Sequence, residues 1–239
     1  MTRSPARQLR ERLLDLAAPA VAEHSRRFFK TGPGEYGEGD EFLGIRVPDL
    51  RRLAREHRSA PESAVWALLR SREHEARLLA LIMLVERFQK GTSETRERIY
   101  ARYMTEIADR VNNWDLVDSS ASEIVGAYLE HRNRQPLYAL ARSRSVWERR
   151  VAIIATHRFI RQEFYADTFA IAEILLDDPE DLIHKAVGWM LREVANRDQR
   201  GAEAFLRRHY RAMPRTMLRY AIEKFPEARR QAYLRGTVR

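Results

Sequence analysis

The sequence predicts an all-α protein, an α-solenoid of antiparallel helix pairs, and two observations support this prediction. The 239 residues include 32% charged side chains but only 10 Gly and 9 Pro, a composition typical of helical proteins. Buried helix patterns also recur along the chain at a similar spacing, as they do in stacked helical repeats. We therefore expect almost no sheet and a single domain over residues 1–239.

Four segments have the pattern of a buried helix, beginning at Glu75, Glu148, Leu182 and Arg215. In the third, apolar side chains follow the i, i+3, i+4 rule for one helical face: Ile183, Ala186, Val187, Met190, Leu191 and Val194. When the four segments are aligned, Arg77, Arg150, Lys185 and Arg219 fall at a similar phase. The last three are spaced by about 35 residues, a repeat length typical of helical pairs. Such units indicate an α-solenoid whose repeats bury their faces against their neighbours.

Proline and glycine mark the breaks between these helices. Six prolines are placed near expected helix starts or in loops: Pro48, Pro61, Pro136, Pro179, Pro214 and Pro226. The segment from Thr31 to Gly44 is rich in glycine, but no Gly-Lys-Ser/Thr ends it and no strand precedes it, which excludes a phosphate-binding P-loop. We expect an ordered loop that joins two N-terminal helices.

The charge balance indicates a polyanionic partner. The chain carries 43 Lys and Arg against 34 Asp and Glu, a net charge of +9, and such a positive field attracts nucleic acid. No apolar run approaches the roughly 20 residues that span a bilayer, and the N-terminus lacks the pattern of a secretory signal. The expected location is the cytoplasm, with nucleoid association when DNA is bound.

Composition also argues against several kinds of site. The absence of cysteine excludes disulfides, thiol catalysis and zinc–thiolate centres. The seven histidines are scattered without metal-ligand spacing, so neither a metal nor a cofactor is expected. The serines at 119, 120 and 122 lack the sequence context of a nucleophile.

Two expected helices carry cations on the face opposite their apolar stripe. Lys185, Trp189 and Arg192 cluster within about 60° on a helical wheel. Either this is a surface for DNA, or Trp189 covers a neighbouring loop and the cations are only solvated. In the preceding helix, Arg150, His157 and Arg161 share a face, which fits either a row of phosphate contacts or a solvated surface.

The stretch VNNWDLVDSS, residues 111–120, breaks the repeat pattern, since it offers Asp115 and Asp118 where the other repeats offer a cation. Trp114 and Asp118 are one turn apart and point the same way. They flank an expected apolar stripe: Leu116, Val117, Ala121, Ile124 and Tyr128. Asn112 or Asn113 is the expected N-cap. The acidic residues either complement the helix dipole or form a reactive site in a basic surface.

Four separated motifs resemble the AlkD-like DNA alkylation repair glycosylases, which are built of HEAT-like repeats. These motifs are FLGIRVPDLRRL from Phe42, NNWDLVD from Asn112, VWERRVAI from Val146 and IHKAVGWMLRE from Ile183. The resemblance covers nearly the whole chain. It implies an enzyme with a concave basic surface that binds duplex DNA and releases N3- or N7-alkylated purines by cleaving the N-glycosidic bond. No cofactor or obligate protein partner is implied, and an open groove for DNA works as a monomer, although the oligomeric state is left open.

The resemblance also implies roles for particular residues. The catalytic carboxylate matches Asp118, the ring beside it Trp114, the second ring Trp189 and the phosphate-holding arginine Arg150. Further DNA contacts are expected from cations and a histidine: Arg46, Arg77, His157, Arg161, Lys185, Arg192 and Arg219. Two departures bear on lesion preference, because the Gly-rich loop is longer than in the AlkD type and Arg46 replaces a familiar neutral polar residue.

Two other functions remain open at this point. A non-catalytic solenoid that binds damaged or branched DNA explains the basic face but not a Trp and Asp pair on it. A protein-interaction scaffold is a common use of helical repeats. It predicts binding that does not depend steeply on salt, whereas nucleic-acid binding does.

Overall fold

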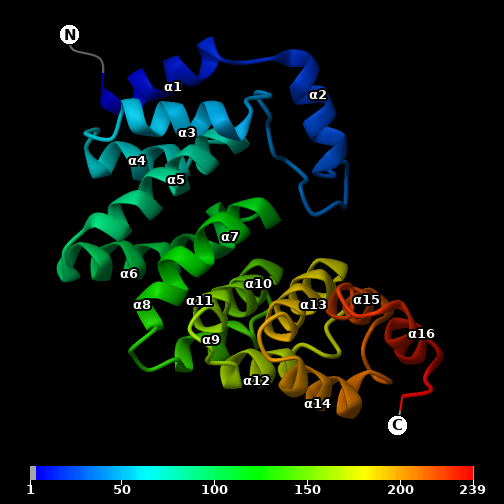
Figure 1. Cartoon of the computed structure of the whole chain (residues 1–239). Helices are drawn as coiled ribbons and strands as arrows, with labels where there is room; N and C mark the ends of the chain where they lie inside the picture. Colours follow the sequence, from blue (N-terminus) through cyan, green and yellow to red (C-terminus); the bar gives the residue numbers. More distant parts are fainter. Residues whose placement is uncertain (1–3, 239) are drawn as a thin grey trace. The chain divides into compact units, whose positions relative to one another are not determined.

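The computed structural model of the chain describes residues 4–238, which form α-helices joined by loops (Figure 1). Residues 4–238 contain no β-strand beyond an isolated bridge between Glu41 and Glu73. The predicted all-α, solenoid-like fold is confirmed. Contacts divide the chain into two compact units, Met1–Ser120 and Ala121–Arg239. None of the helices described is long and apolar enough to cross a bilayer.

The first unit is formed by the helices from α1 to α7. They are α1 (Pro5–Asp15), α2 (Pro19–Phe28), α3 (Val47–Glu56), α4 (Glu62–Leu69), α5 (His74–Lys90), α6 (Ser93–Arg110) and α7 (Trp114–Ala121). Helix α5 is the centre of this unit, since α1, α3, α4 and α6 all pack against it (Figure 1). The expected amphipathic helix from Glu75 is therefore buried on more than one face, including Leu78, Leu81 and Phe88.

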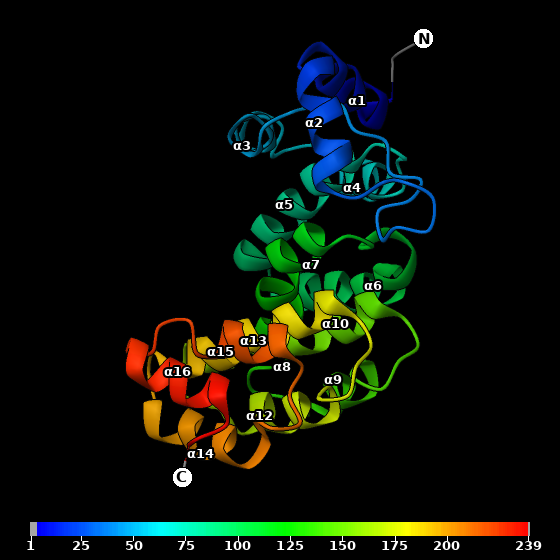
Figure 2. The same cartoon turned by 90° about the vertical axis from the view of Figure 1, so that its right-hand side faces the viewer.

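The second unit contains the remaining elements. They are a π-helix η1 (Ser122–Gly126), α8 (Ala127–Leu129), α9 (Gln135–Leu140), α10 (Val146–Ala155), α11 (His157–Ile160), α12 (Ala166–Ile174), α13 (Asp181–Ala195), α14 (Gln199–His209), α15 (Arg215–Ala221) and α16 (Glu227–Arg235). Helices α10, α13 and α15 lie side by side in one row, and α12 and α14 lie in a second row (Figures 1 and 2). Gly188 allows the close approach of α13 and α15, because a Cβ there would lie 2.5 Å from the Met217 carbonyl oxygen.

All four helices expected from the repeat pattern are present, as α5, α10, α13 and α15. The predicted apolar stripe of α13 is buried throughout. Pro61, Pro214 and Pro226 occupy the N-cap positions of α4, α15 and α16, where their fixed φ suits a helix start. The segment from Glu148 differs from expectation, since the helix is interrupted at Thr156 and α11 follows as a separate turn.

Arg77 and Arg150 do not lie on exposed faces, contrary to the helical-wheel prediction. Each is only 4% exposed. The reason is that interior helices of this fold are covered on several sides; α10, for example, packs against α9, η1 and α13. The Arg150 guanidinium donates to the Leu182 carbonyl oxygen at 2.5 Å. A row of solvent-facing cations therefore does not include these two arginines.

The Gly-rich segment is an ordered loop between α2 and α3, as predicted. Gly44 ends it with a φ of +80°, and a Cβ at this position would lie 2.3 Å from the Ala18 carbonyl oxygen. A residue with a side chain would be strained in this conformation and would clash with the backbone. This glycine brings the loop back against the start of α2, and the preceding residues then run along the first turn of α5.

Candidate active site

Helix α7 carries the two residues that the sequence places at the reactive position. Asn113 precedes the helix, and its side-chain oxygen accepts from the Trp114 N–H at 2.8 Å. This is the first helical N–H, not the second or third that an N-cap side chain serves. Leu116, Val117, Ala121 and Ile124 are fully buried in this element and its continuation. Trp114 and Asp118 are half-buried, so they flank the buried stripe as predicted. A half-buried carboxylate beside an indole ring can face a ligand and still be held by the fold.

A buried tyrosine lies within electrostatic reach of Asp118. Tyr103 on α6 is fully buried, and its hydroxyl lies 2.8 Å from the Ser120 hydroxyl. Ser120 in turn donates to the Leu116 carbonyl oxygen at 2.6 Å. Burial raises the pKa of Tyr103, and the negative charge of Asp118 raises it further. The phenol therefore stays neutral, and the Asp118 charge is felt inside the unit because little water screens it.

Trp114 is fixed by aromatic packing. The Phe29 ring stacks on it with centroids 5.4 Å apart and an interplanar angle of 18°. Phe28 meets the Trp114 ring edge-on at 5.9 Å and is 58% exposed. Phe29 also stacks on Phe42, at 5.0 Å. One face of the indole is therefore covered by the end of α2, an arrangement favourable for aromatic pairs.

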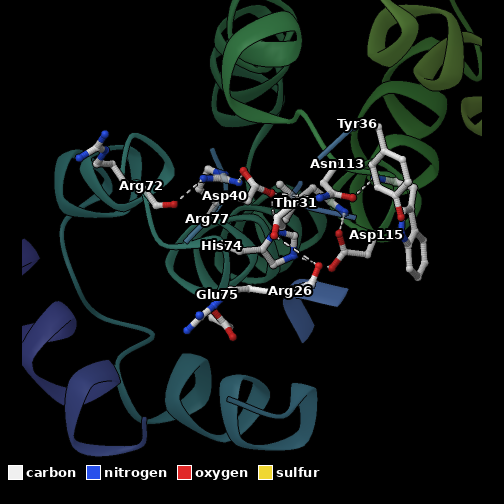
Figure 3. A network of polar contacts seen from close by, with 12 residues as sticks. Arg26, Thr31, Tyr36, Asp40, Arg72, His74, Glu75, Arg77, Asn113 and Asp115 are labelled. Atoms are coloured by element: carbon white, nitrogen blue, oxygen red, sulfur yellow. Dashed lines mark hydrogen bonds and ion pairs between the residues drawn. The ribbon is translucent and has the colours of Figure 1, made fainter. Parts of the chain in front are cut away.

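A buried polar network joins the Gly-rich loop to α7 through the first turn of α5 (Figure 3). The His74 ring lies with Asp40 on one side and Asp115 on the other, its Nδ1 3.2 Å from Asp40 Oδ2 and its Nε2 2.8 Å from Asp115 Oδ2. Arg77 donates to Asp40 Oδ1 at 2.6 Å, and Asn113 donates to Asp40 Oδ2 at 3.0 Å. This network gives Arg77 a structural partner in place of the expected DNA phosphate.

The charges within the network stabilise one another. Burial opposes ionisation of Asp40, but the hydrogen bond from His74 and the charge of Arg77 hold its pKa below the usual value. Burial likewise disfavours a charged His74, but the hydrogen bonds to Asp115 and Asp40 outweigh it and raise its pKa to about 9. Asp115 and Asp118, which belong to the same short motif, therefore lie in different surroundings, because Asp115 faces inward and contacts His74.

Glu75 attaches the end of the Gly-rich loop to α5. Its carboxylate accepts from the backbone N–H groups of Leu43, Gly44 and Ile45, at 2.9, 2.7 and 3.2 Å. The side chain is buried. A charged acceptor that serves several buried N–H groups contributes more than a neutral hydrogen bond does.

We expect Glu75→Gln to lower the free energy of unfolding by about 2 kcal/mol, because one carboxylate oxygen becomes an NH₂ donor that faces a backbone donor. Urea unfolding measures the change. Glu41→Gln is the matched control, since Glu41 is an exposed carboxylate beside the same loop whose ion pair with Arg72 is long, at 3.5 Å. Equal stability of the two variants would contradict the role of Glu75.

Helix α13 of the second unit carries Trp189 half-buried, with Lys185 and Arg192 one turn away on either side. Both cations have acidic partners, since Lys185 lies 2.7 Å from Asp181 and Arg192 pairs with Glu223. The Trp189 indole N–H donates to Glu193 at 3.2 Å. Surface ion pairs of this kind contribute little to stability, so DNA phosphates can replace the carboxylates at low cost.

His157 and Arg161 lie close to these side chains in the second unit. The His157 ring is 5.9 Å from the Trp189 ring, centroid to centroid. Burial and the charge of Arg161 lower the pKa of His157, so it is neutral near pH 7 and does not supply the expected cation. Arg161 is exposed but contacts Glu123 at 2.7 Å and the Ser122 hydroxyl at 3.2 Å.

Arg46 and Arg219 are exposed, and each lies near one end of a helix, where it is accessible to a polyanion. Arg46 is the N-cap residue of α3, and Arg219 lies in the last turn of α15. No ion pair involves either of them within residues 4–238. They fit the expected phosphate contacts best among the predicted cations. Residues 4–238 hold no group of His, Asp and Glu side chains suited to a metal ion.

The sequence did not reveal the polar network. His74, Asp40 and Asn113 come from three segments, and hydrogen bonds between residues 34 to 73 positions apart leave no periodic pattern. The only local signal is the run of charged residues at the start of α5, from Arg72 to Arg77. A cluster of charges at the first turn of a strongly apolar helix indicates buried polar contacts.

Comparison with known proteins bears on the fold and on the family that the motifs resemble. The model of the DNA alkylation repair enzyme family matches residues 9–225. Two solved structures share the fold, a predicted DNA alkylation repair enzyme from Enterococcus faecalis and the protein smu.31 from Streptococcus mutans UA159. The first has a TM-score of 0.67 at 16% identity and covers 88% of this chain and 97% of its own. The second has a TM-score of 0.53 at 14% identity, with 94% and 100% covered.

No curated protein matches the sequence significantly. The two structures share too little sequence to carry more than the fold. The family match, in contrast, extends over most of the chain and includes the whole of α5, α7, α10 and α13. The chain therefore belongs to the family of DNA alkylation repair enzymes.

Proposed function

We propose that the protein is a DNA glycosylase that releases N3- and N7-alkylated purines from duplex DNA, with Asp118 as the catalytic carboxylate. The observation that supports this most is the placing of Trp114 and Asp118 one turn apart, both half-buried, at the edge of an otherwise buried helix. A helix that needed them only for capping would not require an aromatic ring beside the second carboxylate.

The chemistry of the substrate suits one carboxylate. An N7-alkylated guanine already carries a positive charge, so when the C1′–N9 bond breaks its electron pair passes to the purine and neutralises that charge. The sugar is left as an oxocarbenium ion. The Asp118 carboxylate stabilises that cation and orients water, which adds to C1′ and loses its proton to the carboxylate or to solvent. No strong general acid is needed for the leaving group.

Trp114 contributes a rigid, electron-rich surface. One of its faces is covered by Phe29, so its orientation is fixed before a ligand binds. An indole favours contact with a cation, and both the alkylated base and the developing sugar cation qualify. Trp189 and Arg150 are assigned to the nucleotide and its phosphate by the sequence motifs alone, and these roles stay predictions.

The proposal predicts selectivity for cationic lesions. In single-turnover assays with oligonucleotide duplexes, we expect release of 7-methylguanine or 3-methyladenine and no release of uracil or hypoxanthine, which are uncharged. Binding to unmodified duplex should weaken steeply with salt, because neutralised phosphates release counterions. Tight DNA binding without release of any base would instead support a non-catalytic DNA binder. A flat salt response would support a protein scaffold.

A further inference from the structure

The first turn of α7 is held by side chains that approach it from three other segments: α5, the Gly-rich loop and the end of α2. From the polar side, Asp115 bonds to His74 and Asn113 bonds to Asp40. From the aromatic side, Phe29 packs against both the Trp114 ring and the His74 ring, the latter at 4.9 Å. The imidazole of His74 therefore contacts both the polar and the aromatic side chains that surround Trp114.

Hydrogen-bond geometry identifies the state of His74. Both of its ring nitrogens face carboxylate oxygens, and an ionised carboxylate can only accept. Asp40 also accepts from Arg77 and Asn113, as an ionised carboxylate does. A neutral imidazole donates from one nitrogen only. At the other nitrogen, its lone pair would then face a lone pair of the carboxylate oxygen, which is unfavourable. The arrangement is satisfied by an imidazolium ion that donates to both sides.

The charges that face the ring balance. Asp40 from the Gly-rich loop and Asp115 from α7 are opposed by His74 itself and by Arg77 from α5. The uncharged rings of Phe29 and Phe42 pack against the imidazole. His74 is 2% exposed. A buried ion cluster of this kind is costly to disturb, because loss of one member leaves an uncompensated charge.

The network ends on backbone groups of α7. The Asn113 side-chain oxygen accepts from the Trp114 N–H at 2.8 Å, and Asp115 Oδ1 accepts from the Leu116 N–H at 2.9 Å. The remaining atoms of the same two side chains bind Asp40 and His74. Any displacement of His74 is thus transmitted to the turn that carries Trp114, and from there to Asp118 one turn later.

We propose that His74 is a positioning residue of the active site, and that as an imidazolium ion bridging Asp40 and Asp115 it holds Trp114 and Asp118 in the orientation for base release. This rests on the proposed glycosylase function. It also gives the Gly-rich loop a role, since that loop supplies Asp40. The raised pKa of His74 agrees with the geometry. Small displacements of catalytic groups can cost about 10²-fold in rate.

The test combines His74→Gln, Asp115→Asn and a control. We expect single-turnover base release to fall about tenfold to a hundredfold in both variants, with the Kd for duplex DNA unchanged. Arg134→Gln is the control, because it breaks a partly buried ion pair, with Asp167 at 2.5 Å, in the second unit. Asp115→Asn keeps an oxygen for the Leu116 N–H and offers its amide NH₂ to a neutral His74, so it serves as the second variant if His74→Gln does not fold.

The pH profile separates positioning from general destabilisation. Dividing the wild-type rate by the His74→Gln rate at each pH removes any effect of substrate titration. This ratio should approach one as pH rises through about 9, because His74 then loses its proton. The ratio for Arg134→Gln should not follow this curve. Wild-type rates in folded His74→Gln and Asp115→Asn would overturn the proposal.

A second readout does not depend on activity. In protein labelled with ¹⁵N at histidine, the His74 signals, identified by their loss in His74→Gln, should show both nitrogens protonated at pH 7.5. A neutral ring at that pH overturns the proposal. If the wild type releases no base, the glycosylase function fails, and amide exchange of Trp114 and Leu116 then decides the positioning claim. Faster exchange in His74→Gln supports it, and unchanged exchange overturns it.

Discussion

Asp118→Asn is expected to slow the release of alkylated purine by about 10² to 10³-fold, the usual effect of removing one preorganised electrostatic group. Asn has nearly the same size as Asp but carries no charge, so it can neither stabilise the oxocarbenium ion nor accept a proton from water. Asp118 is half-buried and its charge acts on the buried Tyr103 hydroxyl, so water screens it less than a fully exposed carboxylate. Single-turnover rates on 7-methylguanine duplex measure the effect.

The matched control for this variant is Asp109→Asn. Asp109 lies exposed on α6 of the same unit, so its replacement makes the same change in net charge without touching α7. We expect wild-type rates for Asp109→Asn and an unchanged Kd for duplex DNA in both variants. Equal rates for Asp118→Asn and Asp109→Asn would remove Asp118 from the mechanism.

The second large effect is expected on stability. The pKa of His74 in the folded protein, about 9, is above its ordinary value of 6.5. A group with a raised folded pKa contributes its full stabilisation below pH 6.5, and that contribution is lost as pH rises through about 9. A difference of this size corresponds to a loss on the order of 3 kcal/mol. The free energy of unfolding should therefore fall between pH 6.5 and pH 9.

Urea unfolding at several pH values measures this loss, and His74→Gln supplies the reference. All other groups are common to both proteins, so the difference between the two curves isolates His74. In His74→Gln we expect lower stability at pH 6.5 but little further loss up to pH 9. Parallel curves for the wild type and the variant would show that His74 is not charged in the folded state.

The Gly-rich loop has a clearer role in the structure than in the sequence. By sequence it is an extension relative to the AlkD type, with consequences only for lesion preference. In the structure it supplies Asp40 to the His74 network and is fastened to α5 by Glu75. Asp40 and the loop end that Glu75 anchors are thus part of the support of α7.

Much of the fold and the reactive helix could be predicted from the sequence because both depend on local periodicity. The spacing of apolar residues located α5, α10 and α13, and the half-exposed setting of Trp114 and Asp118 follows from their place beside the buried stripe. The burial of Arg77 and Arg150 could not be predicted in this way. A helical wheel assumes a single buried face, whereas packing from several sides covers these interior helices.

The partners of most charged residues could not be predicted from the sequence either. Asp115 and Asp118 look equivalent in the motif, but one bonds to His74 and the other lies near Tyr103. Their difference depends on which distant segments meet α7. The ion pair of Arg192 with Glu223 depends in the same way on a separate segment, whereas Lys185 pairs with Asp181 one turn earlier on its own helix.

The most direct measurement is the identity of the products formed from a duplex that contains a single 7-methylguanine. Chromatography with mass detection distinguishes the possible reactions. The account predicts free 7-methylguanine together with an abasic site in the strand, formed by the wild type in the absence of any added cofactor. Recovery of unmodified guanine in an intact strand, or of the unchanged lesion after prolonged incubation, would contradict it.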